Sequence, residues 1–407
     1  MEHRVRLAIM ARTTHRVGFA LVALAYAAAT AGGSVPTPLY VLYQRRDHFG
    51  TTMISVVFAV YVIGVVAGLL VAGAHAERIR RRPLLGAALA LQILAAAVFL
   101  AWPDLPGILT GRVLSGLSIG LLSGPATAYL IELRRRALPD GDPRQAEVVA
   151  TAANLGGIAA GPLLSGVLAE WAPAPLRLPF VVIGALLALA AILLATVPET
   201  TETTAARANR RPLATAPDQR HLFLASCFGG LLAFAMFGLF SALSPTFLSG
   251  TLGYHSHALA GLVAFVGLGA AAFGQVGLRK LPPRPAMRTV VVAMPVGLAL
   301  IVGGVWAGSL GLFILGGVLT GGAAGLLFRA CLTTVVQLST PERRAGMLAT
   351  LFVTGYSGLA IPVIGLGLAT QLAGTRGALA GFATLTLAGL AAVAAVRLRP
   401  EQRLEMS

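Results

Sequence analysis

Residues 113–122 read VLSGLSIGLL, and residues 318–327 read VLTGGAAGLL, at an offset of 205. A second pair, Thr37-Pro38-Leu39-Tyr40 and Ser244-Pro245-Thr246-Phe247, repeats at an offset of 207. Apolar segments often share small residues by chance, so either match alone is weak evidence. Two matches at nearly one offset favour a chain built by duplication.

The composition around these segments is that of a membrane protein. Hydrophobic residues make up 57% of the 407 residues and charged residues only 11%, whereas soluble domains carry roughly a quarter charged residues. This comparison excludes a set of ordinary soluble domains. It indicates that lipid surrounds most of the chain.

Twelve apolar segments are long enough to cross a bilayer, which requires about 20 residues per helix. The first, from about Val17 to Tyr43, is longer than the apolar core of a signal peptide, so we expect a transmembrane helix there. If the short gap at Ala307–Leu310 is not a turn, the count falls to eleven. The expected spans lie near 17–42, 52–74, 84–102, 106–130, 147–169, 178–197, 221–249, 257–278, 288–307, 310–335, 346–370 and 376–396.

The distribution of basic residues predicts the topology. The net charge is +16, but most arginines lie in the two chain ends and in alternate connections rather than in one patch. A nucleic-acid-binding protein needs such a patch, so we expect no nucleic-acid partner. An even number of helices with both termini cytoplasmic explains the alternation. We therefore expect a multi-pass protein of the cell (inner) membrane.

These patterns together predict an all-α integral membrane fold of about 12 transmembrane helices, in two six-helix parallel repeats. The one long connection on the basic side lies at the middle of the chain and is rich in Thr, Ala, Arg and Pro. We expect a six-helix N-terminal half over 1–197, a cytoplasmic linker over 198–221 and a six-helix C-terminal half over 222–407.

The connection between the second and third spans carries a recognisable motif, Gly-Ala-His-Ala-Glu-Arg-Ile-Arg-Arg-Arg from Gly73 to Arg82. It resembles the loop motif Gly-x-x-x-Asp-Arg-x-Gly-Arg-Arg/Lys of the major facilitator superfamily. Glu77 replaces the Asp and Arg80 replaces the second Gly; the matching residues are Gly73, Arg78, Arg81 and Arg82. The resemblance implies a conformational latch, in which Glu77 faces the start of the eleventh helix and Arg78 pairs with Glu132. Ordinary positive-inside charge explains the arginines alone.

Arg112 lies inside the fourth span, where a charged side chain costs at least ~2.5 kcal/mol and should face the bundle interior or water. Its segment, Arg-Val-Leu-Ser-Gly-Leu-Ser, resembles the superfamily's Arg-x-x-Gln-Gly-x-Gly motif, which implies a role in proton coupling. The alternative is an arginine that snorkels outward. Asn154 and Arg329 are further candidates for the cleft; helix–helix hydrogen bonding and snorkelling are their plainer explanations.

The fifth span contains Gly157-Ile-Ala-Ala-Gly161-Pro162-Leu-Leu-Ser-Gly166. Glycines four residues apart allow close helix contact, and a proline bends a helix. The segment is similar to the Gly-x-x-x-Gly-Pro-x-x-Gly-Gly motif of the superfamily's drug/proton antiporters, which implies efflux. Generic packing of small residues is the alternative.

Prolines in corresponding helices of two repeats point to a central pathway. Aromatic and flexible side chains on the helices around such a pathway could contact a substrate. For any single one of these side chains, contact with the protein core or with lipid is the alternative. The candidate pathway residues are Pro38, Tyr40, Phe237, Pro245 and Tyr356.

No Asp or Glu lies deep within any span, so a proton pathway would rest on Glu170, Asp47 or a histidine near the outer face. We find no phosphate-binding loop or metal-binding motif, and so expect no enzyme activity, cofactor or metal. The sequence predicts a monomeric secondary transporter of small amphipathic or apolar compounds, and the resemblance implies that it exports them in antiport with protons. The alternatives are an importer or facilitator of a small polar metabolite, and a sensor or scaffold that transports nothing.

Overall fold

The computed structural model describes residues 2–75, 80–142, 144–200 and 219–398. In these ranges the chain is helical and contains no strand. The helices of the N-terminal half are α1 (Glu2–Ser34), η1 (Thr37–Leu39), α2 (Tyr40–Asp47), α3 (Thr51–His75), α4 (Arg81–Ala101), α5 (Leu105–Ala137), α6 (Arg144–Trp171) and α7 (Leu178–Ala195). Those of the C-terminal half are α8 (Arg220–Gly238), η2 (Leu239–Leu243), α9 (Ser244–Gly250), α10 (His257–Val276), α11 (Pro283–Ala307), α12 (Leu310–Leu338) and α13 (Pro341–Arg397).

The predicted number of spans is confirmed within the described residues. Eleven helices are long and apolar enough to cross a membrane, and the last of them contains two spans. Gly374, with φ 68° and ψ 169°, breaks α13 between the segments expected to be the eleventh and twelfth spans. The short gap after Ala307 is a turn, because Gly308 ends α11 in the left-handed conformation that glycine tolerates.

The first span of each half is not a continuous helix. In the N-terminal half α1 ends at Ser34 and the chain continues through the 3₁₀ turn η1 into α2. In the C-terminal half α8 passes through the π-helical turn η2 into α9. Pro38 lies in η1 and Pro245 lies at the start of α9. A proline lacks the N–H that a continuous helix needs, so the prolines fall at corresponding interruptions.

The repeat is visible in the packing as well as in the sequence. In each half the fourth span, α5 or α12, lies at the centre and contacts the first, second and third spans of that half. A Cβ atom at Gly116 or Gly120 of α5 would collide with the carbonyl oxygens of Tyr61 or Val65 in α3. A Cβ atom at Gly321 or Gly325 of α12 would collide in the same way with α10. The glycines shared by the two repeated decapeptides therefore allow the same helix contact in both halves.

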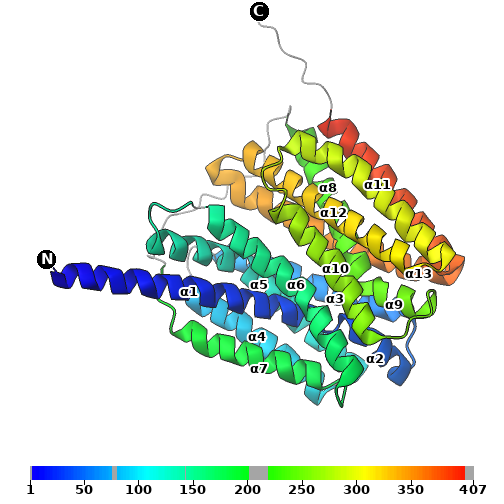
Figure 1. Ribbon diagram of the computed structural model, residues 1–407, viewed down its shortest axis with the longest axis horizontal. Helices are drawn as coiled ribbons and strands as arrows, with labels where there is room; N and C mark the ends of the chain where they lie inside the picture. Colours follow the sequence, from blue (N-terminus) through cyan, green and yellow to red (C-terminus); the bar gives the residue numbers. More distant parts are fainter. Residues whose placement is uncertain (1, 76–79, 143, 201–218, 399–407) are drawn as a thin grey trace, which may run out of the picture.

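The halves meet through two equivalent contacts, α6 with α10 and α3 with α13. Figure 1 shows the N-terminal half in blue to green and the C-terminal half in green to red, with α6 and α10 side by side at their border. We call the end of the bundle where α5 finishes and α6 begins the arginine-rich end, after Arg134, Arg135, Arg136 and Arg144. The end that carries α2 and the α6–α7 connection is the opposite end.

Candidate functional site

A carboxylate joins the two halves at the opposite end. Oε2 of Glu170, in the last turn of α6, accepts hydrogen bonds from the backbone N–H groups of His257 at 2.7 Å and Ala258 at 3.4 Å. These are the first residues of α10, whose N-terminal N–H groups have no partner within the helix. A carboxylate here also interacts favourably with the helix dipole. Glu170 therefore caps a helix of the other half.

Further hydrogen bonds join the halves at the same end. The Ser55 hydroxyl donates to the carbonyl oxygen of Val363 at 3.2 Å, and Gln371 hydrogen-bonds Thr52. Arg45 and His255 lie 3.4 Å apart, nitrogen to nitrogen. These pairs link α2 and the start of α3 to the C-terminal half. The opposite end is consequently closed between the halves.

The glycines of the fifth-span motif contact two different helices. A Cβ atom at Gly157 or Gly161 would collide with the backbone of α1, at Ala27 and Ala31. At Gly166 it would instead meet the backbone of α10 in the other half, and Gly261 of α10 approaches Pro162 just as closely. The motif thus packs α6 within its own half along one stretch and against the other half along the next.

Arg112 is buried in the N-terminal half, with only 1% of its surface exposed. Its Nη1 donates to the carbonyl oxygen of Gly33 at 2.7 Å, a group in the last turn of α1 that the helix break leaves without a helical partner. The guanidinium lies 4.0 Å from the ring centroid of Tyr61. Outward snorkelling of Arg112 is therefore wrong, because its side chain points into the bundle.

Polar atoms without partners are found around this arginine. Within the described residues, Arg112 pairs with no carboxylate, and its Nε is buried without a hydrogen bond. The hydroxyls of Tyr40 and Tyr43 and Oε1 of Gln92 are also buried and unpaired. Tyr40 interacts electrostatically with Arg112. Burial of unpaired polar groups is unfavourable, and these atoms keep hydrogen-bonding capacity that the described chain does not use.

The C-terminal half contains a cluster of aromatic rings. The ring of Phe234 lies 5.3 Å from Phe237, 5.0 Å from Phe328 and 5.1 Å from Tyr356, centroid to centroid. These rings come from α8, α12 and α13. Tyr356 belongs to α13, which packs against α3 of the N-terminal half.

Only part of the predicted latch can be placed. Glu77 and Arg78 lie outside the described residues. Glu132, predicted to pair with Arg78, pairs in the described part of the chain with Arg81, Oε1 to Nε at 3.3 Å, and accepts a hydrogen bond from Thr200. Arg82 donates its backbone N–H to Glu199 at 3.1 Å, and Gly73 is exposed near the end of α3.

The other cleft candidates differ in their contacts. Arg329 donates to the carbonyl oxygens of Leu278 at 2.7 Å and Leu281 at 3.3 Å, in the connection between α10 and α11. These contacts stay within the C-terminal half. Asn154 is half-buried in α6, and its side chain hydrogen-bonds no described residue. The cleft roles of both remain predictions.

Sequence reasoning missed a second buried arginine. Arg397 looked like one more basic residue at the chain end, but it is only 9% exposed. It donates to Sγ of Cys331 at 3.1 Å, to Thr334 at 2.7 Å and to Ser226 at 3.4 Å, and so ties α13 to α12 and α8. Tyr61 was missed as well, because one aromatic residue in an apolar span carries no signal of its own.

Two packed six-helix bundles, tied together at one end, with a buried arginine in one and an aromatic cluster in the other, define a multi-pass membrane transporter. The family model of the Major Facilitator Superfamily matches residues 22–357. The chain belongs to this superfamily.

The solved structures that this chain resembles are transporters of the same fold. A bacterial homologue of the human lysosomal transporter Spinster, in an inward-facing and unoccupied conformation, aligns with a TM-score of 0.71 at 14% identity over 94% of this chain and 95% of that one. The human organic anion transporter MFSD10 aligns with a TM-score of 0.68 at 17% identity, over 93% of this chain and 99% of that one. A variant of the nucleoside transporter NupG aligns with a TM-score of 0.69 at 14% identity, over 94% of this chain and 100% of that one. Among curated proteins, none matches this sequence.

Proposed function

We propose that this protein is a secondary active transporter that exports small amphipathic or apolar compounds by alternating access, in antiport with protons. The observation that carries the proposal is the placement of hydrogen bonds between the halves. They lie at the opposite end, at Glu170, Ser55 and Gln371. Described contacts at the arginine-rich end, such as Arg81 with Glu132, stay within one half.

The charge distribution supports an orientation in the inner membrane. The positive-inside rule places the arginine-rich end, the linker and both termini in the cytoplasm. The closed end then faces outward, and the chain is in an inward-facing conformation. The resemblance to the Spinster homologue, described as inward-facing, agrees with this assignment.

The two faces of the border support an amphipathic substrate. The aromatic rings of Phe234, Phe237 and Tyr356 offer a contact surface for an apolar body. Arg112 and the Tyr40 hydroxyl offer polar groups on the N-terminal side. The motif from Gly157 to Gly166, typical of drug/proton antiporters, supports export rather than import.

We assign proton coupling to Arg112, with Asn154 and Arg329 as further candidates. A buried cation that lacks a carboxylate partner among the described residues is sensitive to any change of charge nearby. A proton that arrives at or leaves a neighbouring group would therefore alter the free-energy balance between conformations.

The second candidate function is transport of a small polar metabolite, in either direction. Arg112, with its unpaired Nε, and the unpaired hydroxyls of Tyr40 and Tyr43 favour it. A site with such unpaired polar groups strongly favours substrates that form hydrogen bonds with them over substrates that cannot.

Transport into inside-out vesicles with an imposed pH gradient tests the proposal. Wild type should accumulate an exported compound from a broad panel only with the gradient, and Arg112→Ala should lose the gradient-driven part. Accumulation that does not depend on the gradient would remove antiport. Absence of uptake of every compound would favour a sensor.

Two further experiments test the parts outside the described residues. Glu77→Ala should shift the balance between inward and outward conformations, and unchanged cysteine accessibility at both faces would exclude the latch. Tags in the 198–221 segment and at both chain ends should be accessible from the same side of the membrane.

A further inference from the structure

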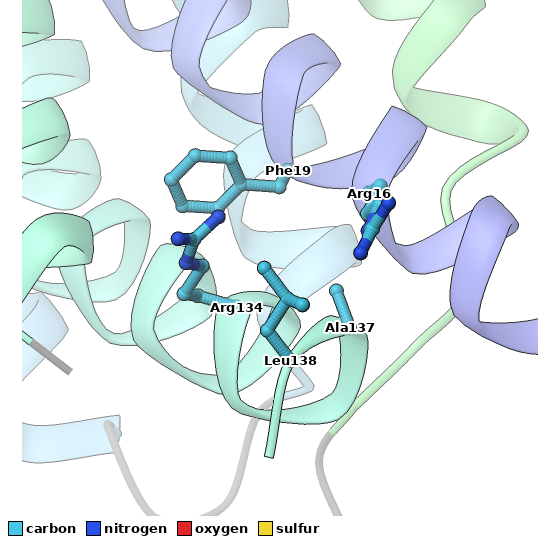
Figure 2. A pocket seen from close by; sticks show the side chains of 5 residues that line it. All are labelled: Arg16, Phe19, Arg134, Ala137 and Leu138. Carbon is cyan, nitrogen blue, oxygen red and sulfur yellow. The ribbon is translucent and has the colours of Figure 1, made fainter. Parts of the chain in front are cut away.

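A pocket of about 420 Å³ opens at the arginine-rich end between α1 and α5. Its volume falls within the usual range of small-molecule sites, roughly 300–1,000 Å³. Figure 2 shows the side chains that line it, which are Arg16, Phe19, Arg134, Ala137 and Leu138. The proposed transport function uses none of these residues.

The lining carries two guanidinium groups and no acidic residue. One Nη of Arg134 is occupied by Oε1 of Gln145, but its Nε is buried and has no partner among the described residues. The Arg134 guanidinium also lies 5.9 Å from the ring centroid of Phe19, a distance at which a cation–π contact holds it in place. That Nε has no accessible surface, so Arg134 offers the pocket its positive charge and its second Nη rather than its Nε.

No acidic residue of the described chain lines the pocket, and two carboxylates at this end already have partners. Glu132 is held by Arg81 and Thr200, and Glu199 accepts from the backbone of Arg82. The end of α5 at Ala137 contributes about half a negative charge from the helix dipole. Two full positive charges exceed it, so the pocket favours an anion.

The shape of the lining selects among anions. Arg16 and Phe19 lie three residues apart on α1 and so share a face of that helix. The apolar run of the first span starts at about Val17, directly after Arg16, which places the pocket where the bilayer core meets its polar boundary. Phe19 and Leu138 supply an apolar wall beside the two cations. Arginine binds phosphate oxygens through two N–H groups at once, and basic pockets at this depth suit lipid headgroups.

We infer that this pocket binds the phosphate group of an anionic phospholipid, with the start of an acyl chain against Phe19 and Leu138. A free phosphate ion offers the same group without the chain. A phospholipid needs the apolar wall for its acyl chain, whereas a free phosphate ion does not. The experiment below distinguishes the two ligands.

The test is native mass spectrometry of the full chain in neutral detergent, titrated with phosphatidylglycerol. Arg16→Gln/Arg134→Gln should raise the dissociation constant of the first bound lipid by roughly tenfold or more. Arg135→Gln is the matched control, because Arg135 is the exposed neighbour of Arg134 and does not line the pocket. It should bind like wild type. The double lysine variant Arg16→Lys/Arg134→Lys controls for folding and should bind more tightly than the double glutamine variant but more weakly than wild type, because it keeps both charges and loses the paired N–H groups.

Inorganic phosphate, titrated alone, identifies the source. In one outcome, wild type binds inorganic phosphate but no phosphatidylglycerol, and the double glutamine variant binds neither. That result would keep the phosphate site but make its ligand a free ion rather than a lipid. Equal lipid binding by wild type and the double glutamine variant would overturn the inference. An equal loss in Arg135→Gln would also overturn it, since general positive charge would then explain the affinity.

Discussion

The two halves share a backbone plan but differ in the chemistry of their interiors. Both interrupt their first span and pack their fourth span through glycine. In its interior, however, the N-terminal half holds Arg112 and unpaired tyrosine hydroxyls, whereas the C-terminal half holds rings around Phe234. Duplication preserved what helix packing requires and left the side chains near the border free to diverge. The substrate, on this view, meets two unlike surfaces.

The largest effect should come from the shared glycines. Gly120→Ala and Gly325→Ala each place a methyl group against a backbone carbonyl, and should lower the free energy of unfolding by about 3 kcal/mol, the upper end for overpacking. Thermal unfolding monitored by size-exclusion measures this. Gly124→Ala, on the same α5 with no atom within 4 Å of the new Cβ, is the control. If Gly120→Ala and Gly124→Ala are equally stable, the close helix contact at Gly120 is not required for stability, and the two halves do not share this packing requirement.

The arginines of the two fourth spans, of which Arg112 is buried and Arg329 half-buried, should respond in opposite directions. Arg112→Met loses one bond to the Gly33 carbonyl, worth about 1.5–3 kcal/mol, but removes an uncompensated charge that costs several kcal/mol. Stability should rise while transport falls. Arg329→Met leaves carbonyls of the α10–α11 connection without a donor, and stability should fall by about 1–3 kcal/mol. A destabilised Arg112→Met would mean that Arg112 is structural.

The contact between the halves should show a smaller effect. Glu170→Gln weakens the cap on α10 by about 0.5–2 kcal/mol, and should open the opposite end. Spin labels at the exposed positions Trp171 and Tyr254 should then report longer distances. Glu147→Gln, at the other end of α6, is the control and should leave the distances unchanged. If both variants resemble wild type, Glu170 does not hold the halves together.

The smallest effect should come from the ion pair of the N-terminal half. Glu132→Gln breaks the partly exposed pair with Arg81, and stability should fall by less than about 1 kcal/mol. The loss should disappear at high salt, because exposed charges are screened. A larger, salt-independent loss would mean that Glu132 is as important to its half as Arg329 is to the other.

The spans and the repeat could be predicted from the sequence, because apolar length and basic charge are local properties of the chain. The repeated decapeptides showed that Gly116 and Gly321 correspond to each other. The sequence did not predict which helix each glycine contacts. The roles of Glu170 and Arg397 could not be predicted. Glu170 bonds backbone N–H groups, which every residue except proline has, and Arg397 looks like any other basic residue at the end of a span.

Gly374 joins the last two spans without a loop between them. The helix that follows it is continuous to Arg397, a length of about 33 Å at 1.5 Å per residue. One end of this rod lies beside Gln371, which is bonded across the border to Thr52, and the other end is anchored by Arg397 to α8 and α12. Because no loop separates the two spans at Gly374, a tilt of α13 at the opposite end would also move the helix that follows, and the Arg397 anchor would either resist that tilt or shift with it.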